Sequence, residues 1–131
     1  MTDKTSPDDG LGTSTAVADI DYHKLFESSR DAIMLLDPEV GYIDCNAAAL
    51  RLFAVPSKEE FLRLTPEDLS PELQPDGSRS DSLVPKMLET IMKEGSHLWN
   101  WRHRDVNGRE FPTTIHGSRI DLGDRVILQG T

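Results

Sequence analysis

The chain has 131 residues, of which 37% are apolar and 28% charged, and its net charge at neutral pH is −9. This size and composition favour a single globular domain with one hydrophobic core. The acidic charge disfavours nucleic acid as a partner, because phosphate backbones are also negative. No apolar run approaches the roughly 20 residues of a membrane span, and we recognise no secretory signal. We therefore expect a cytoplasmic protein that does not insert into membranes.

Residues 1–18 are rich in Asp, Thr, Ser, Gly and Pro and contain almost no large apolar side chains. Such a segment cannot recover its ordering entropy by burial, so it predicts a disordered tail before a domain at 19–131. Tyr22, Leu25 and Phe26 then recur at helical spacing, which predicts a short helix over 22–29 with one apolar edge. Asp21 is placed to cap it.

Two short strands are predicted next, at 31–37 and 42–45, joined by the turn at 37–41. Asn46 is a good cap for a following helix. The apolar face of that helix consists of Ala48, Ala49, Leu52 and Phe53. Ser57 begins a capping-box pattern and predicts another small helix, and the prolines in 65–80 then restrict that stretch to a loop with single turns.

The clearest helical pattern covers 81–94, where a continuous apolar stripe predicts that one face lies on a sheet. The stripe consists of Leu83, Val84, Met87, Leu88, Ile91 and Met92. Pro85 is compatible with a helix in or near its first turn, and Gly95 is expected to end it.

The last third of the chain is predicted to be strand, at 97–105, 109–120 and 125–131. The Asn107-Gly108 pair is expected to supply the positive φ of a tight hairpin between the first two of these strands. Because the last strand is still running at Thr131, we expect the domain to be cut in or just after it and the natural protein to continue.

Several motifs in this order resemble the PAS domain family. They are the spacing of Asp37, Gly41 and Asn46 around the first hairpin, the Asn-Ala-Ala start of the following helix, and the hairpin sequence NGREFP at 107–112. The family usually has Asp-Gly at this last position. The segments TPEDLSPELQPDG and WNWRHRD resemble a subgroup found at the front of bacterial sensor histidine kinases and cyclic-di-GMP enzymes. The resemblance covers residues 22–131.

The resemblance implies an α+β PAS fold, with a five-stranded antiparallel sheet in the order 2-1-5-4-3 and the helices on one face. It also implies a cavity between helix and sheet, with Phe111, Thr113, Ile115 and Gly117 facing inward. Strand alternation then turns Trp99 and Trp101 inward as well. The candidate pocket residues are Phe53, Met87, Leu88, Ile91, Trp99, Trp101, Phe111 and Ile115.

The two tryptophans allow two interpretations: an aromatic wall for a flat cofactor, or bulk that fills the core. We favour the second, so we expect either a small ligand or a filled core, and predict no cofactor and no metal. The helix at 81–94 lacks the axial histidine that haem-binding family members present, and His97, Met87 and Met92 have simpler roles in a strand and a core.

Cys45, the single cysteine, lies outside the helical motif of the flavin-photoreceptor branch and fits a buried structural thiol. A non-covalently bound flavin is the remaining cofactor alternative. No catalytic constellation is present, so we expect no enzymatic activity in this chain itself.

These observations favour a sensory input and dimerisation module of a larger bacterial signalling protein, a sensor histidine kinase or a diguanylate cyclase. The helix at 22–29, with Tyr22, Leu25 and Phe26, is expected to pack on the outer face of the sheet or on a second copy. One alternative is a small-ligand or cofactor sensor. Another is a protein-interaction platform with a filled core, which would use the sheet face near Leu98, Asn100 and Arg102. An output domain is expected after Thr131.

Overall fold

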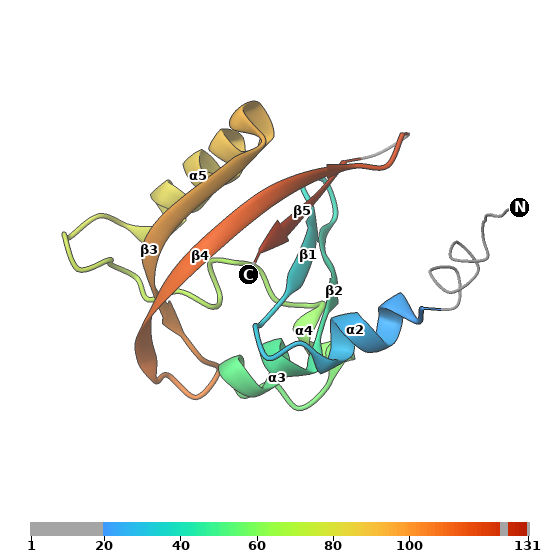
Figure 1. The fold of residues 1–131 in the computed structure, drawn as a ribbon. Helices are drawn as coiled ribbons and strands as arrows, with labels where there is room; N and C mark the ends of the chain where they lie inside the picture. The colour runs from blue at the N-terminus through green and yellow to red at the C-terminus, as the bar shows by residue number, and fades with distance from the viewer. Residues whose placement is uncertain (1–19, 124–125, 131) are drawn as a thin grey trace, which may run out of the picture.

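In the computed structural model, which describes residues 20–123 and 126–130, four helices and five strands follow one another (Figure 1). The tail predicted at 1–18 lies outside the described residues. The elements are α2 (Tyr22–Ser28), β1 (Met34–Asp37), β2 (Gly41–Cys45), α3 (Ala47–Phe53), α4 (Lys58–Phe61), α5 (Ser80–Glu94), β3 (Ser96–Arg104), β4 (Glu110–Asp121) and β5 (Val126–Gly130). The predicted α+β composition is confirmed, with boundaries shifted by a few residues. None of the helices in the described part of the chain is long and apolar enough to span a bilayer.

The strands form one antiparallel sheet in the order β2-β1-β5-β4-β3. The long strands β3 and β4 pair along their whole length, from Ser96 opposite Ser118 to Arg104 opposite Glu110. Along β3, and along β4 as far as Gly117, the odd-numbered residues are less exposed than their neighbours, because successive side chains point to opposite faces. Even-numbered residues of this paired region, such as Leu98 and Thr114, are exposed on the other face.

Helices α3 and α5 pack on the same face of β3 and β4. Phe53 of α3 contacts the rings of His103 and Phe111, which are odd-numbered residues of the two strands. Ile91 of α5 lies against the backbone of Gly117, another odd-numbered residue, where an added Cβ would come within 2.3 Å of Ile91 Cδ1. The absence of a side chain at Gly117 therefore allows α5 to approach the sheet.

Helix α5 begins at Ser80, one residue before the predicted start, and Pro85 is its sixth residue, just beyond the first turn. The proline deprives the Asp81 carbonyl of its helical partner. Both residues are exposed, so water can satisfy that carbonyl. The helix ends as predicted at Gly95, which takes a positive φ of 90° and donates its backbone N–H to Ile91 O.

The hairpin between β3 and β4 differs from the predicted Asn-Gly turn. Gly108 has a positive φ of 91°, whereas Asn107 does not. The turn is organised instead by Asp105, whose Oδ1 accepts from the backbone N–H groups of Asn107 and Arg109, both at 2.9 Å. A five-residue loop at 105–109, closed by a buried carboxylate, therefore replaces the three-residue connection at 106–108 that the predicted strands left.

The loop between α4 and α5 runs along β3 and bonds to its backbone. Gln74 accepts from Arg102 N through its side-chain oxygen at 2.9 Å and donates to Arg102 O through its side-chain nitrogen at 3.1 Å. Leu69 O accepts from Arg104 N at 2.8 Å. The loop is therefore fixed to the sheet by specific hydrogen bonds, although prolines exclude regular structure from it.

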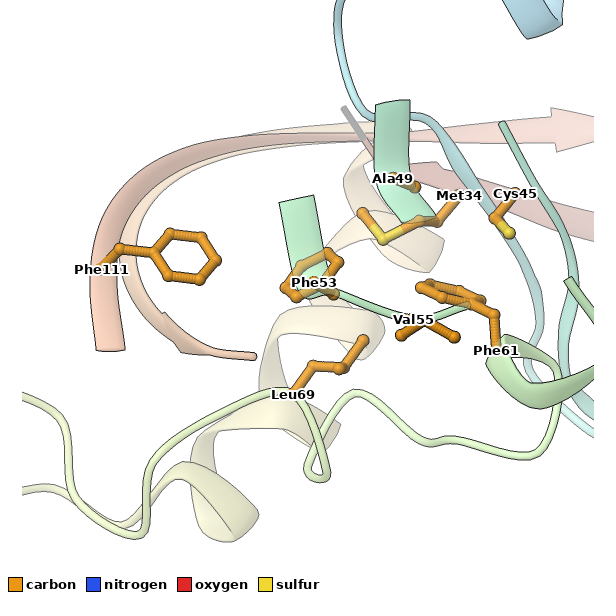
Figure 2. Close-up of a cluster of buried hydrophobic side chains, with 8 residues drawn as sticks. All are labelled: Met34, Cys45, Ala49, Phe53, Val55, Phe61, Leu69 and Phe111. Atoms are coloured by element: carbon orange, nitrogen blue, oxygen red, sulfur yellow. The ribbon is translucent and has the colours of Figure 1, made fainter. Parts of the chain in front are cut away.

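The core has two parts. The larger cluster surrounds α3, and its aromatic side chains converge between the helix and the sheet (Figure 2). It consists of Met34, Cys45, Ala49, Phe53, Val55, Phe61, Leu69 and Phe111. The smaller cluster, of Leu36 and Ile91 with partly buried neighbours that include Trp99, lies beneath α5. The first cluster is densely filled with rings, and the second borders the cavity described below.

Asn46 joins the N-terminal elements to one another. Its side chain is fully buried, and its Oδ1 accepts from Ile33 N at 2.9 Å and from Ala49 N at 3.0 Å. Its Nδ2 donates to Phe26 O at 3.0 Å and to Asp31 O at 2.9 Å. The cap predicted for α3 is thus also the group that holds α2 and the start of β1 in place.

We expect Asn46→Ala to lower the free energy of unfolding by about 3 kcal/mol, because it removes a cap and leaves buried backbone groups without partners. Urea denaturation followed by circular dichroism measures the loss. Ser57→Ala is the matched control, because it removes an exposed cap bond to Glu60 N and should cost about 1 kcal/mol or less. Equal losses in the two variants would contradict the role of Asn46.

Candidate functional site

A cavity of about 90 Å³ lies between α5 and the sheet. The described side chains that line it are almost all apolar or neutral polar. They are Met34, Leu36, Tyr42, Pro66, Ser70, Val84, Met87, Leu88, Ile91, Trp99, Trp101, His103, Ile115, Gly117 and Gln129. The cavity is smaller than the sites of about 300 Å³ or more that hold drug-sized ligands.

Six of the eight predicted pocket residues line this cavity: Met87, Leu88, Ile91, Trp99, Trp101 and Ile115. Phe53 and Phe111 do not. Their rings pack against each other at 5.9 Å in the cluster around α3. The family resemblance correctly gave the face of β4 on which Phe111 lies, but the face alone does not show which end of the strand borders the cavity.

Other lining residues, from the first hairpin, the proline-rich loop and the last strand, were not predicted from the sequence. Met34 and Leu36 alternate on β1, so the period of the strand could have identified them. His103 lies on the same face of β3 as the two tryptophans, so alternation could have identified it too. No sequence pattern indicated that Ser70 and Gln129 line the cavity, because their positions depend on loop geometry and on strand pairing.

Two polar side chains at the cavity have their hydrogen bonds satisfied within the protein. Trp101 donates from Nε1 to Ser70 Oγ at 2.9 Å, and Ser70 in turn donates to Pro66 O at 2.8 Å. Thr113 donates its hydroxyl hydrogen to Trp101 O at 2.9 Å, so the contact of 2.9 Å between Thr113 Oγ1 and His103 Nδ1 requires the imidazole to donate. His103 Nδ1 therefore carries the hydrogen.

The ionisable groups at the cavity are neutral at physiological pH. Burial lowers the pKa of His103 to about 4, and burial, with the negative charges of Glu67 and Asp68, raises the pKa of Tyr42 above its usual value. No Asp, Glu, Lys or Arg side chain is found among the described lining residues. The cavity therefore offers no countercharge to an ionic ligand.

Trp99 has one buried polar atom without a partner. Its ring stacks on His97 at 4.8 Å, and its opposite partner on β4 is Ile115. Its Nε1 is buried and has no hydrogen-bond acceptor within the described structure. Buried donors are normally satisfied, so this N–H is an exception that requires an explanation.

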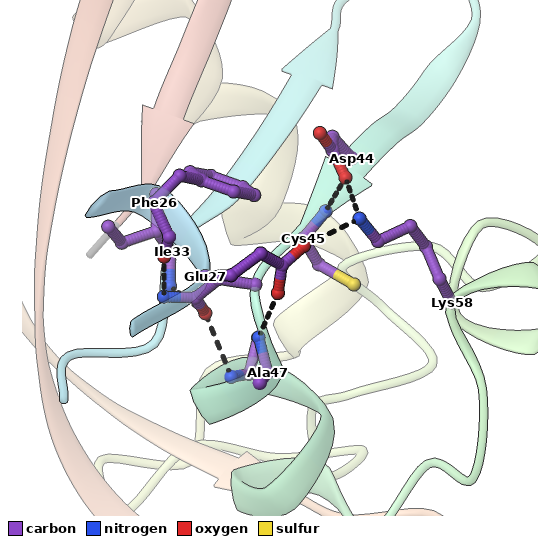
Figure 3. A network of polar contacts seen from close by, with 9 residues as sticks. Phe26, Glu27, Ile33, Asp44, Cys45, Ala47 and Lys58 are labelled. Atoms are coloured by element: carbon purple, nitrogen blue, oxygen red, sulfur yellow. Dashed lines mark hydrogen bonds and ion pairs between the residues drawn. The ribbon is translucent and has the colours of Figure 1, made fainter. Parts of the chain in front are cut away.

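Helix α2 presents the other candidate surface. Its inner side is anchored, because Glu27 accepts from Ala47 N at 3.0 Å through one carboxylate oxygen and pairs with Lys58 Nζ at 2.9 Å through the other (Figure 3). Lys58 also pairs with Asp44 at 2.8 Å, and these two carboxylates raise the pKa of Lys58. The predicted interface residues Tyr22 and Leu25 are 63% and 57% exposed, whereas Phe26 is half-buried.

The described hydrogen bonds and ion pair of α2 join it to Asn46 and Ala47 at the beginning of α3 and to Lys58 of α4. Packing of its apolar edge on the outer face of the sheet or on a second copy stays a prediction. The hydrogen bonds from Asn46 and Glu27 fix α2 at the beginning of α3, so its apolar edge remains open to solvent.

A family model described as a PAS domain matches residues 21–88, which is more than half of the chain. The chain belongs to the PAS domain family. PAS domains are regulatory sensory modules of signalling proteins. No curated protein matches this PAS domain in sequence.

Solved PAS structures share its fold. A PAS domain from a two-component sensor histidine kinase has 17% sequence identity and a TM-score of 0.67, with 91% of this chain and 94% of that chain covered. A domain of a sensory box sensor histidine kinase/response regulator from Geobacter sulfurreducens has 26% identity and a TM-score of 0.64, covering 93% and 96%. The PAS domain of a LuxR-family transcriptional regulator from Burkholderia thailandensis, in complex with ethanol, has 18% identity and a TM-score of 0.64, covering 86% and 96%.

The residues that were considered as cofactor or metal ligands are packed against other side chains in this PAS domain. Cys45 is fully buried, and burial raises the pKa of its thiol to about 11, so the thiol is protonated at neutral pH. Met87 lines the cavity, Met92 packs beside Ile91, and the ring of His97 stacks on Trp99. Among the described residues, no group of three or more His, Cys, Asp or Glu side chains could hold a metal ion.

The buried His103 should make the PAS domain sensitive to acid. Its pKa is lower in the folded chain, at about 4, than the ordinary value of 6.5, so the unfolded chain binds more protons between these pH values. We expect stability to be complete above pH 6.5 and to fall as the pH approaches 4, by about 3 kcal/mol from this group.

Urea denaturation of the wild-type and His103→Gln proteins across this pH range isolates the contribution of His103 to the free energy of unfolding. The glutamine variant retains an amide donor for Thr113 but does not titrate, whereas the carboxylates titrate in both proteins. The difference between the two stability curves should therefore change between pH 6.5 and 4. Parallel curves would show that His103 is not buried in its neutral form.

Proposed function

We propose that this PAS domain is the signal-input and dimerisation module of a larger bacterial signalling protein, either a sensor histidine kinase or a diguanylate cyclase. The observation that carries the proposal is α2, a helix with an anchored inner side and an exposed apolar edge. The anchors from Asn46, Glu27 and Lys58 hold Tyr22 and Leu25 in fixed positions. A second copy of the chain is the proposed occupant of this edge.

The energetics of a short helix support this role. A helix of seven residues is unstable alone in water and depends on tertiary contacts. Here the contacts on the inner side are mostly polar, whereas Ile20, Tyr22 and Leu25 expose 43%, 63% and 57% of their surface. Covering these side chains in a symmetric pair would remove apolar area from water and stabilise the helix of each copy.

The alternative function is that of a small-ligand sensor. The cavity beneath α5 supports it, as does the ethanol complex of the similar domain from Burkholderia thailandensis. A flavin or haem version has less support, because a cavity of about 90 Å³ cannot enclose such a large ring system without rearrangement. A small ligand and a dimer are compatible, since the two sites use different elements.

A protein-interaction platform is the third candidate. Leu98 is 65% exposed on the outer face of β3, and Asn100 beside it is exposed as well. A single exposed leucine is common on protein surfaces, so this face has less support than the edge of α2.

Dimerisation can be tested by sedimentation equilibrium at micromolar concentration. We expect the wild-type chain to be a dimer and Leu25→Asp to be a monomer, because a charge would be buried in the interface. Leu98→Asp is the matched control and should remain a dimer. A wild-type monomer, or a dimer unaffected by Leu25→Asp, would refute the role of α2, and loss of the dimer in Leu98→Asp alone would favour the sheet face.

The absence of a chromophore is a separate prediction. Freshly purified protein should show neither a Soret band nor a flavin band in its visible absorption spectrum, because the cavity is too small for either group. Mass spectrometry of the supernatant after denaturation checks for colourless ligands. A flavin or haem band at stoichiometric intensity would overturn this expectation and favour the cofactor-sensor alternative.

A further inference from the structure

A second hollow lies on the outer face of the sheet, away from the cavity beneath α5. It is a groove of about 470 Å³ bordered by β3, β4 and the loop that precedes α5. Its lining includes Gln74, Pro75, Asn100, Arg102, Pro112 and Thr114. The strand residues among these six are even-numbered, so they lie on the face turned away from α5. The volume falls in the range of about 300–1,000 Å³ that is usual for small-molecule sites.

The groove presents hydrogen-bond donors without an acidic partner. Arg102 is half-buried, and its guanidinium makes no ion pair or hydrogen bond with the described residues. Asn100 Oδ1 accepts from Thr114 Oγ1 at 3.2 Å, which leaves the amide hydrogens of Asn100 available. No Asp or Glu is found among the described lining residues. The groove therefore offers one positive charge and several donors to an anion.

The main chain of Arg102 is held in place by Gln74. Gln74 Oε1 accepts from Arg102 N at 2.9 Å, and Gln74 Nε2 donates to Arg102 O at 3.1 Å and to Ser80 Oγ at 2.9 Å. Gln74 is itself buried, so these bonds are shielded from water. A donor on a fixed main chain loses less conformational entropy on binding than one on a mobile loop. The site of Arg102 is thus formed before any ligand binds.

The charge of the groove favours a carboxylate over other anions. A guanidinium presents two parallel N–H groups that match the two oxygens of a carboxylate. Arg102 is the single cation of the described lining, so a doubly charged anion would keep one charge uncompensated. It would also meet stronger repulsion from a chain whose net charge is −9. An anion with one negative charge is therefore the best match.

The remaining walls favour an apolar body on that carboxylate. Pro75 and Pro112 are both exposed at the groove, and neither has a backbone N–H. The aliphatic stem of Arg102 adds further apolar surface. A flat ring lying against these groups would bury apolar area while its carboxylate stays at the guanidinium.

We propose that this groove binds a small monocarboxylate with a flat apolar body, whose carboxylate pairs with the Arg102 guanidinium and accepts a hydrogen bond from Asn100 Nδ2. The site goes beyond the input and dimerisation role and lies on the opposite face of the sheet from the cavity. It selects by charge and by shape, because neutral amides lack the ion pair and inorganic anions lack the apolar body.

Sodium benzoate is a probe of this class, and NMR of the whole chain locates its site. In ¹H–¹⁵N spectra we expect saturable shifts of the Asn100 side-chain amide and the Arg102 Nε–H, with a dissociation constant in the millimolar range. The methyl groups of Leu88 and Ile91 should not respond, because the cavity of about 90 Å³ is smaller than the about 150 Å³ that accommodates benzene. Titration at constant ionic strength keeps the screening of charges unchanged.

Benzamide and two arginine variants are the matched controls. Benzamide has the shape of benzoate without its charge and should bind roughly tenfold more weakly or not at all. Arg102→Gln should weaken benzoate binding about tenfold, because it removes the charge inside the groove. Arg104→Gln removes the same charge from the next even-numbered position of β3, outside the groove, and should change the dissociation constant by less than about threefold. Circular dichroism checks that both variants fold.

Three results would overturn the proposal. They are the lack of a saturable response of the Asn100 and Arg102 signals to benzoate, equal affinity for benzamide, and equal losses in Arg102→Gln and Arg104→Gln. The last result would show that the charge of β3 attracts benzoate without a defined site. None of the three bears on the edge of α2, so sedimentation alone decides the dimer. A monomer that binds benzoate would retain this site and lose the dimerisation role.

Discussion

The architecture of this PAS domain depends on the buried amide of Asn46. Each of its two polar atoms serves two backbone groups, and together they join α2, the segment before β1 and the first turn of α3. The amide supplies both donors and acceptors, so neither a carboxylate nor a hydroxyl could make all four bonds. The position of α2, and so of its exposed edge, follows from this one side chain and from the carboxylate of Glu27 beside it.

The two halves of the core have different properties for a simple geometric reason. Around α3, small alanine side chains let the helix lie close to the sheet, and the rings of Phe53, Phe61 and Phe111 fill the remaining space. Beneath α5, the helix is held against the sheet where Ile91 meets Gly117, and long side chains leave a void beside this contact. One end of the domain is therefore filled with rings, and the other contains the cavity.

Much of the fold could be predicted because local patterns and the PAS motifs agree. Helical spacing at 81–94, the parity of the tryptophans in β3 and the family resemblance in β4 gave the correct faces. The features that could not be predicted depend on contacts between residues that are distant in the sequence. The sequence identified Asn46 as a cap but could not show its bonds to Phe26 and Asp31, and the Asn107-Gly108 pair concealed the control of the turn by Asp105.

In the candidate site, too, local patterns predicted some features, whereas others depend on tertiary contacts. Alternation placed Trp99 and Trp101 at the cavity, and the resemblance placed Ile115 there. Phe53 and Phe111 were also assigned to the cavity, but they lie in the cluster around α3. The missing acceptor of Trp99 could not be anticipated, because an unsatisfied group is defined by everything around it. Packing density and hydrogen-bond completeness are properties of the folded chain.

The hydrogen bonds between Gln74 and Arg102 have a consequence for the edge of the sheet. An edge strand exposes donors and acceptors that can recruit strands from other chains and begin aggregation. The amide of Gln74 occupies the outward donor and acceptor of Arg102, and Leu69 occupies the donor of Arg104. A side chain and a loop carbonyl thus substitute for a sixth strand, and this half of the edge is closed to cross-β assembly without any lengthening of the sheet.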